Sequence, residues 1–285
     1  FGSPKYAPVL EAKVSGKWVK VAGITLTEVP TTVSFPAVTS DTFRLLVAPP
    51  PHTAPSGLGS IAPGAMIVDI FGSHSDKVMI GHWALSAENK IQRAQVKAGY
   101  AMAMDYQTLG QTKSDADAIS PQSVINLTSK ISSDGKLKWT PPKGSKWRVV
   151  RFGYSLLGTT NHPATPEATG LEADKLDAAA VKRYVDHYLG LYKQTLKTDN
   201  LAQAGIGAMV VDSYEAGSAN WTGAMIEKFK TLRGYDPTPW LPVLTGSLVG
   251  SAKQSEAFLN DFRQTLSDLI STEHYKTIAE EAHKA

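Results

Sequence analysis

Short apolar runs separated by turn residues characterise the chain up to about residue 155. These runs are rich in β-branched and aromatic residues, and Gly, Pro and Asp lie between them, which is typical of strands. The segments expected to be strands are 10–14, 18–21, 43–47, 65–71, 78–85, 136–139 and 147–154. Strands at this spacing indicate an antiparallel β-sandwich, and residues 86–120 are expected to form helix or loop.

After about residue 155 the pattern changes to helices alternating with a buried strand. Asp177 is suited to cap a helix whose apolar stripe comprises Val181, Tyr184, Val185, Tyr188 and Tyr192. Residues 206–211 are apolar without alternation, which predicts a strand covered on both faces in a parallel sheet. Further helices are expected from about Thr222 to Gly234 and from about Ser255 onward.

The order helix, buried strand, helix is that of an α/β barrel or a doubly wound sheet. A chain of 285 residues that is 42% hydrophobic and 19% charged can bury two cores. We therefore expect a β-sandwich domain over residues 1–155 and an α/β domain over residues 156–285. Phe1 at the start, and a helical pattern with no closing Gly or Asn at the end, suggest an internal fragment of a longer protein.

Charge and composition exclude several classes of function. The net charge of +3 comes from 29 basic and 26 acidic residues that are scattered along the chain, so nucleic acid is not an expected partner. The absence of cysteine excludes disulfides, thiolate metal sites and a cysteine nucleophile. No stretch approaches the roughly 18 apolar residues of a membrane span.

The polar residues directly after the predicted strand 206–211 are the first candidates for chemistry. Asp212, Ser213, Tyr214 and Glu215 lie there, and the carboxyl end of a barrel strand is where catalytic residues are placed. Glycosidic hydrolysis usually needs two carboxylates, and Glu215 is positioned to be one. The alternative is that Glu215 caps the next helix or pairs with Arg233.

Two further segments could line a sugar site. Trp221, next to Asn220, offers an indole face on which a sugar ring can pack, although a tryptophan in the core is the common alternative. The polar loop 161–175 carries Glu172, Asp174 and Lys175, which either line the site or form a solvated loop leading into the next helix.

Several motifs together carry a resemblance to a known family. They are the segments 148–155, 167–175, 212–215 with Asn220-Trp221, and 233–236 with 241–246. In this order they resemble the α-L-rhamnosidases of glycoside hydrolase family 106. The resemblance implies an incomplete (β/α)8 TIM-type barrel preceded by the β-sandwich that interrupts the barrel in such enzymes.

The resemblance also implies a mechanism and a site. Such enzymes remove terminal α-L-rhamnosyl residues from plant-type polysaccharides or glycosides with inversion, using two glutamates and a calcium ion. Glu215 matches the first glutamate, and its partner is expected beyond Ala285, so the chain alone is expected to be inactive. The expected substrate-binding residues are Glu172, Asp174, Lys175, Asp212, Asn220 and Trp221. No metal ligand, and no oligomeric state, is assigned.

The resemblance further suggests a bacterial protein of the periplasm or the extracellular space, with a rhamnose-containing glycan as its partner. Two other functions stay open at this point. One is a non-catalytic carbohydrate-binding or adhesion protein in which the sandwich holds the glycan. The other is the same barrel acting on a different sugar, because strand-end loops set the specificity of a barrel.

Overall fold

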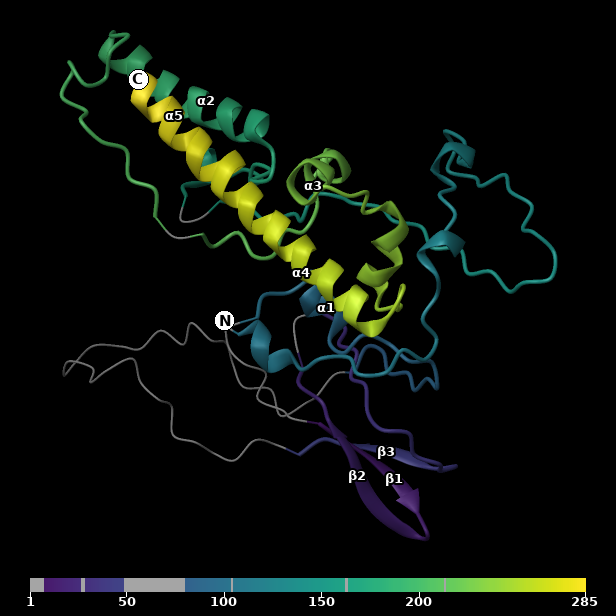
Figure 1. The fold of residues 1–285 in the computed structure, drawn as a ribbon. Coiled ribbons are helices and arrows are strands. Elements are labelled where there is room, and N and C mark those ends of the chain that lie inside the picture. The colour runs from purple at the N-terminus through teal and green to yellow at the C-terminus, as the bar shows by residue number, and fades with distance from the viewer. Residues whose placement is uncertain (1–7, 27–28, 49–79, 104, 162–163, 213) are drawn as a thin grey trace, which may run out of the picture.

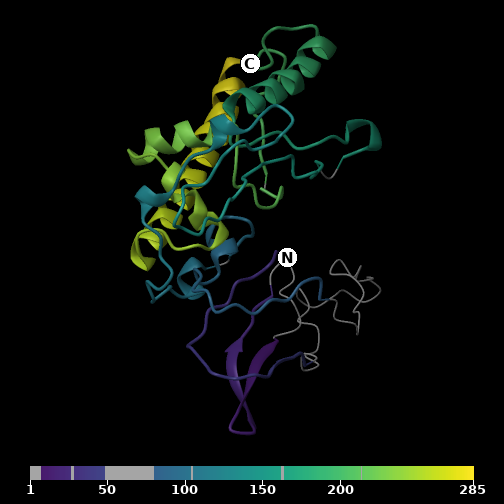
Figure 2. The same cartoon turned by 90° about the vertical axis from the view of Figure 1, so that its right-hand side faces the viewer.

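The computed structural model describes residues 8–26, 29–48, 80–103, 105–161, 164–212 and 214–285. A group of helices forms one part of the molecule, and a small sheet lies beyond one end of that group (Figure 1, Figure 2). The longest helical run, drawn in yellow, carries the C-terminal residues and crosses the helical part (Figure 1). The structure is therefore mixed α and β in content.

The sheet contains three antiparallel strands in the order β2-β1-β3. Its strands are β1 (Val9–Val14), β2 (Lys17–Gly23) and β3 (Phe43–Leu46). They confirm the first three predicted strands. Leu10 and Ala12 of β1 are buried, as alternation along a half-covered strand requires. Ser15 and Gly16 both have positive φ, 49° and 80°, which suits the tight turn between twisted strands.

The remaining predicted strands do not form in the described residues. Residues 136–139 make only one bridge, between Ile131 and Leu137, and residues 80–85 and 147–154 are irregular. The predicted strand 65–71 and residues 78–79 lie outside the described residues. Because β structure depends on hydrogen-bonded neighbours, an apolar run without a partner stays irregular. The described part of the chain contains one sheet, so the sandwich stays a prediction.

Among the residues that the structure describes, five segments are α-helices and several shorter segments are 3₁₀ or π-helical turns. The α-helices are α1 (Ala94–Lys97), α2 (Ala178–Leu196), α3 (Met225–Arg233), α4 (Ala252–Leu269) and α5 (Thr277–Lys284). The 3₁₀ turns are η1 (Tyr106–Leu109), η2 (Pro121–Ser123), η3 (Thr128–Lys130), η4 (Pro166–Ala168) and η5 (Thr238–Thr245), and η6 (Ile270–Lys276) is π-helical. Within the described ranges, every helix is too short or too polar to cross a bilayer.

The helix ends follow local chemistry. Asp177 caps α2 by accepting a hydrogen bond from the Ala179 N–H at 3.0 Å, as predicted. Gly234, with φ 78°, ends α3, which is also confirmed. Ser251 caps α4 by accepting from the Gln254 N–H at 3.1 Å, so α4 begins before the predicted Ser255.

The main core surrounds the aromatic side chains of α4. Phe258 and Phe262 are almost fully buried, and the ring of Phe258 stacks on Trp240 with centroids 6.2 Å apart. Ile91 and Leu176 are buried in the same cluster. The packing therefore crosses residue 155, where the sequence pattern predicts a domain boundary, and the two-domain division stays a prediction.

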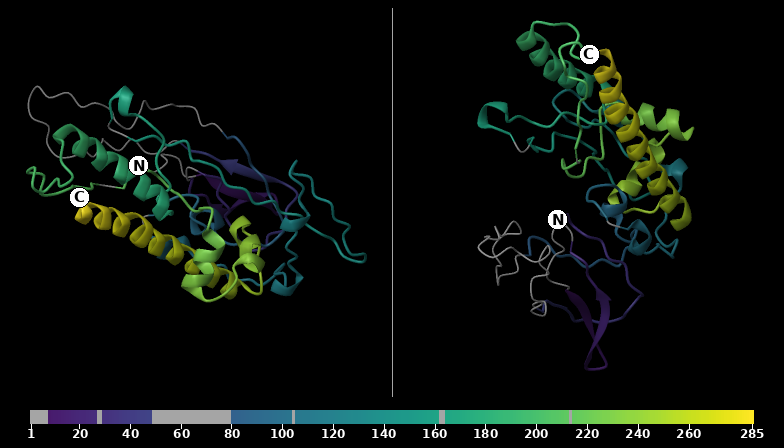
Figure 3. Two further views of the ribbon diagram at one scale, coloured as in Figure 1. Left: turned by 90° about the horizontal axis from the view of Figure 1, so that it is seen from above. Right: turned by 90° about the vertical axis from the view of Figure 1, so that its left-hand side faces the viewer.

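Helices α2 and α5 lie side by side (Figure 1, Figure 3) and share a small cluster of their own. Val181 and Val185 pack against Ile278. Tyr184, Tyr188 and Tyr192, which were predicted to face the core with the two valines, are exposed. The prediction was wrong for the tyrosines because α5 covers only the valine side of α2.

Residues 206–211 do not form the predicted strand. Met209 packs against the cluster of Val181, Val185 and Ile278, whereas the side chain of Val210 is 89% exposed. A strand buried on both faces needs hydrogen-bonded neighbours and a layer on each side, and within the described residues this segment has a layer on one side only. The barrel is likewise not formed by the described residues and stays a prediction.

We expect Phe258→Ala to destabilise this core by about 3–5 kcal/mol, because removal of a buried aromatic ring leaves a cavity. Urea unfolding followed by tryptophan fluorescence measures this, since Trp240 stacks on the Phe258 ring. Ile125→Ala, at an exposed loop position, is the matched control and should change the free energy of unfolding by less than about 0.5 kcal/mol. Equal effects of the two substitutions would contradict this description of the core.

Candidate functional site

The segment before α2 is anchored to the main core and to the segment before α3. Leu176 is fully buried in the core. The carboxylate of Asp174 accepts from the Leu176 N–H at 2.9 Å and from the Thr222 hydroxyl at 2.7 Å. These bonds fix Asp174 between two segments that are 48 residues apart in the sequence.

Lys175 connects this segment to the residues around Glu215. Its ammonium group forms an ion pair with Glu172, and it lies 5.9 Å from the centre of the Tyr214 ring. Burial raises the pKa of Tyr214, and the negative charge of Glu172 raises it further. The structure therefore brings Glu172, Asp174 and Lys175 together beside Tyr214, the residue before Glu215. We call these four residues the Lys175 cluster.

Glu215 and Asp212 are both exposed residues next to this cluster in the chain. An exposed carboxylate can reach a bound substrate, as the hypothesis for Glu215 requires. Arg233, the alternative partner considered from the sequence, instead donates to Thr265 at 3.0 Å and forms an ion pair with Asp268 on α4. The catalytic role of Glu215 and the binding role of Asp212 stay predictions.

Asn220 and Trp221 are engaged with the protein core. The amide of Asn220 donates to the Ala98 carbonyl at 2.9 Å. The ring of Trp221 packs against the main core, with its centroid 6.4 Å from that of Phe262. These contacts favour the alternative interpretation of Trp221 as a core residue, and a sugar contact by its remaining accessible surface stays a prediction.

Sequence analysis missed the residues of the π-helical turn η6. Glu273 binds the Lys228 ammonium at 2.6 Å and accepts from the Ala178 N–H at 3.2 Å, so it ties η6 to α3 and to the start of α2. Burial lowers the pKa of the neighbouring His274, and the positive charge of Lys175 lowers it further. The negative charge of Glu172 raises this pKa. These three residues therefore lie close enough to interact, and no local pattern in the sequence marks the turn.

The same residues include carboxylates that could contribute to a metal site. Among the residues with described positions, no three His, Asp or Glu side chains lie together as a metal site would need. Calcium takes six to eight oxygen ligands, whereas the carboxylates of Glu172 and Asp174 already have protein partners. The described residues therefore do not supply a calcium site by themselves.

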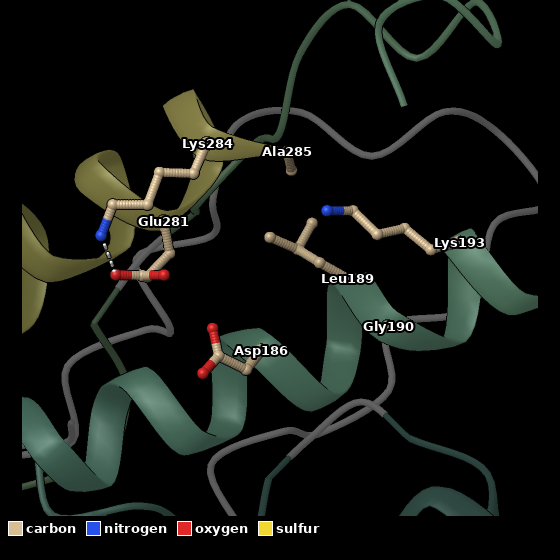
Figure 4. A pocket seen from close by; sticks show the side chains of 7 residues that line it. All are labelled: Asp186, Leu189, Gly190, Lys193, Glu281, Lys284 and Ala285. Atoms are coloured by element: carbon tan, nitrogen blue, oxygen red, sulfur yellow. Dashed lines mark hydrogen bonds and ion pairs between the residues drawn. The ribbon is translucent and has the colours of Figure 1, made fainter. Parts of the chain in front are cut away.

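A surface hollow lies between α2 and α5 (Figure 4), and no residue of the Lys175 cluster lines it. It is lined by Asp186, Leu189, Gly190, Lys193, Glu281, Lys284 and Ala285. Lys182 pairs with both Asp186 and Glu281 at 2.8 Å, and Lys284 pairs with Glu281 at 2.6 Å. The hollow is bordered by ion pairs that join the two helices, and its acids are already occupied.

The Lys175 cluster and the exposed Glu215 offer carboxylates, an ammonium group and a phenol, which can form hydrogen bonds with a polar ligand. The α-L-rhamnosidase family, glycoside hydrolase family 106, matches residues 21–285. The chain therefore belongs to this family of glycoside hydrolases, which confirms the family resemblance inferred from the sequence motifs.

Two relatives agree with this assignment to the glycosidases. The structure of a rhamnosidase from Novosphingobium sp. PP1Y is similar with a TM-score of 0.82 and 42% identity, over 98% of this chain and 24% of that one. A protein of Formosa agariphila provisionally named a beta-glucuronidase is 39% identical over 166 residues, which is 58% of this chain and 14% of that protein. The chain thus spans a quarter or less of the length of either relative.

The electrostatic link between His274 and the Lys175 cluster predicts opposite effects of two substitutions. Lys175→Met should raise the pKa of His274 because it removes a positive charge, and Glu172→Gln should lower it because it removes a negative one. Proton NMR titration of the imidazole measures this, with the signal assigned by its loss in His274→Asn. Lys143→Met, in an exposed loop, is the control. If the pKa of His274 shifted in the same direction in both variants, the placement of His274 near Lys175 and Glu172 would be contradicted.

Proposed function

We propose that the natural full-length protein carrying this chain is an inverting α-L-rhamnosidase in which Glu215 is one of the two catalytic carboxylates. The supporting observation is that the buried Leu176 and the Asp174–Thr222 hydrogen bond hold Glu172 and Lys175 beside Tyr214. Two acids of the loop before α2 are thereby held beside the residue that precedes the exposed Glu215. Family membership supports the same class of reaction.

The proposed chemistry assigns different tasks to the acids. In an inverting enzyme one carboxylic acid protonates the leaving oxygen while a carboxylate about 6.5–9.5 Å away activates water on the opposite face of the sugar. Glu215 performs one of these tasks. Its partner, as the family resemblance implies, is a second glutamate outside this chain, and Glu172 and Asp174 are already held by Lys175, Thr222 and the Leu176 N–H.

The remaining predicted residues hold the substrate in this proposal. The Lys175 ammonium and the Glu172 carboxylate neutralise each other, so together they offer donors and acceptors to sugar hydroxyls without a net charge. Asp212 adds an exposed acceptor near Glu215, and Asn220 positions the segment before α3 through the Ala98 carbonyl. The partner is a carbohydrate, in a bacterial protein exported to the periplasm or beyond.

A second candidate is the same site acting on a different sugar. The relative provisionally named a beta-glucuronidase favours it, because that name implies a sugar that carries a carboxylate. A non-catalytic carbohydrate-binding role is the third, and it would place the sugar on the β1–β3 sheet instead of near Glu215. Binding of sugar that survives deletion of residues 156–285 would support this third function.

We expect Glu215→Gln to lower kcat on an aryl α-L-rhamnoside by about 100- to 10,000-fold, the range that general acid or base catalysis contributes. The measurement uses the full-length protein. Glu227→Gln, at an exposed glutamate of α3 that pairs with Lys230 at 3.3 Å, is the matched control and should retain full turnover.

The same assay separates the candidates. A Glu215→Gln variant with near-normal turnover would exclude Glu215 as a catalytic group. Hydrolysis of an aryl β-D-glucuronide, but not of the rhamnoside, would replace the proposed substrate by a uronide while retaining the glycosidase. Sugar binding without hydrolysis of either compound by the wild type would favour the non-catalytic function.

Calcium enters the proposal on the family resemblance alone, and its ligands are not assigned to residues of this chain. If the full-length protein binds calcium, dialysis against EDTA should lower the midpoint of thermal unfolding as well as activity, because a ligand of the native state stabilises it. Added CaCl₂ should restore both, whereas MgCl₂ should not. Unchanged unfolding and activity after chelation would remove calcium from the proposal.

A further inference from the structure

The π-helical turn η6 lies within the long C-terminal helical run, beside the Lys175 cluster. Residues Ile270–Lys276 adopt π geometry between α4 and α5, and the helical run continues through them without a break (Figure 1). Turns of this kind are rare inside α-helices, and they are frequent at functional sites because they shift side chains out of the α-helical register. The residues that η6 presents are therefore candidates for function.

The turn is held in a fixed position. Glu273 joins it to Lys228 of α3 at 2.6 Å and to the first N–H of α2, at Ala178, at 3.2 Å. Thr272 also donates its hydroxyl to the Asp268 carbonyl at 2.9 Å. Because three helices meet here, the direction in which His274 and Tyr275 leave the helix is determined by the fold.

His274 lies next to the Lys175 cluster without a hydrogen bond at one ring nitrogen. The charge of Lys175 lowers the pKa of the His274 imidazole, and the charge of Glu172 raises it. The ring of Tyr275 lies 4.8 Å from that of His274, centroid to centroid, and Tyr275 also raises the pKa of Tyr214. The Nδ1 atom of His274 is enclosed by protein, and none of the described residues offers it a hydrogen-bond partner. An enclosed polar atom without a partner is unusual and calls for an explanation, and a role in catalysis or in binding a ligand is one such explanation.

The chemistry of this nitrogen suits a sugar hydroxyl. Enclosure without an acceptor disfavours the imidazolium, in which both nitrogens would carry a hydrogen to be satisfied. The neutral ring has one acceptor and one donor, and a hydroxyl group can complement either. Because no hydrogen bond holds Nδ1, rotation of the ring about χ2 toward a bound ligand breaks none.

We propose that His274 is a further substrate-binding residue of the glycosidase site, and that its neutral imidazole binds a hydroxyl group of the sugar through Nδ1. This inference rests on the function proposed for Glu215 and the Lys175 cluster. It adds to that site a residue from η6, 59 positions after Glu215 in the sequence.

Three substitutions in the full-length protein test the assignment at the level of a single nitrogen. The amide of His274→Asn occupies the place of Nδ1, the amide of His274→Gln reaches the place of Nε2, and His274→Leu removes both. KM and kcat on an aryl α-L-rhamnoside, and the Kd of L-rhamnose by calorimetry, are measured for each. His283→Leu, at an exposed position of α5, is the matched control.

We expect His274→Leu and His274→Gln to raise KM and Kd about threefold to tenfold, the usual effect of losing one neutral hydrogen bond, with little change in kcat. The KM and Kd of His274→Asn should stay within about twofold of the wild-type values. Those of His283→Leu should equal the wild-type values. Thermal unfolding of each variant shows whether it is folded, and the comparison of Asn with Gln remains decisive if the Leu variant is not.

The contrary results are distinct. Wild-type KM and Kd in a folded His274→Leu variant would overturn the role of His274 while leaving the rhamnosidase function intact. Rescue by Gln and not by Asn would overturn the assignment to Nδ1. Failure of the wild type to hydrolyse the rhamnoside or to bind rhamnose would overturn the proposed function itself, and this inference with it.

Discussion

The position of the candidate site depends on two residues that share one core. Leu176 and Met225 are both essentially fully buried around the aromatic side chains of α4. Leu176 directly follows Lys175, and Met225 begins α3, shortly after Glu215. Burial of both therefore brings the loop before α2 and the loop before α3 to the same place, and the Asp174–Thr222 hydrogen bond aligns them. Without this shared core the acids around Glu215 would have no common location.

The features that the sequence predicted correctly are those set by neighbouring residues. Asp177 caps α2 because its side chain reaches an N–H two residues later, and Gly234 ends α3 because it tolerates a positive φ. The hairpin of β1 and β2 follows from alternation and the turn at Ser15-Gly16. Asp212 and Glu215 were singled out by their place after an apolar run, and Glu172, Asp174 and Lys175 by their polar loop. The structure holds the loop residues beside Tyr214, and the roles of all five residues stay predictions.

The features that could not be predicted depend on distant partners. Residues 206–211 have the composition of a buried strand, but composition does not specify which segment pairs with them, and here only Met209 meets a neighbouring layer. Trp221 looks the same in sequence whether it packs on Phe262 or on a sugar. His274 lies in an ordinary helical pattern, and the role proposed for it depends on the approach of α2, α3 and the Lys175 cluster to η6.

The central claim is that the sugar binds where the Lys175 cluster meets Glu215. The most direct measurement is a crystal structure of the full-length protein with L-rhamnose bound. We expect a sugar hydroxyl or the anomeric centre within hydrogen-bonding reach of the Glu215 carboxylate, about 2.6–3.2 Å or through one water, with Lys175 lining the same binding site. Rhamnose bound at the β1–β3 sheet, or at a site that Glu215 and Lys175 do not line, would contradict this claim.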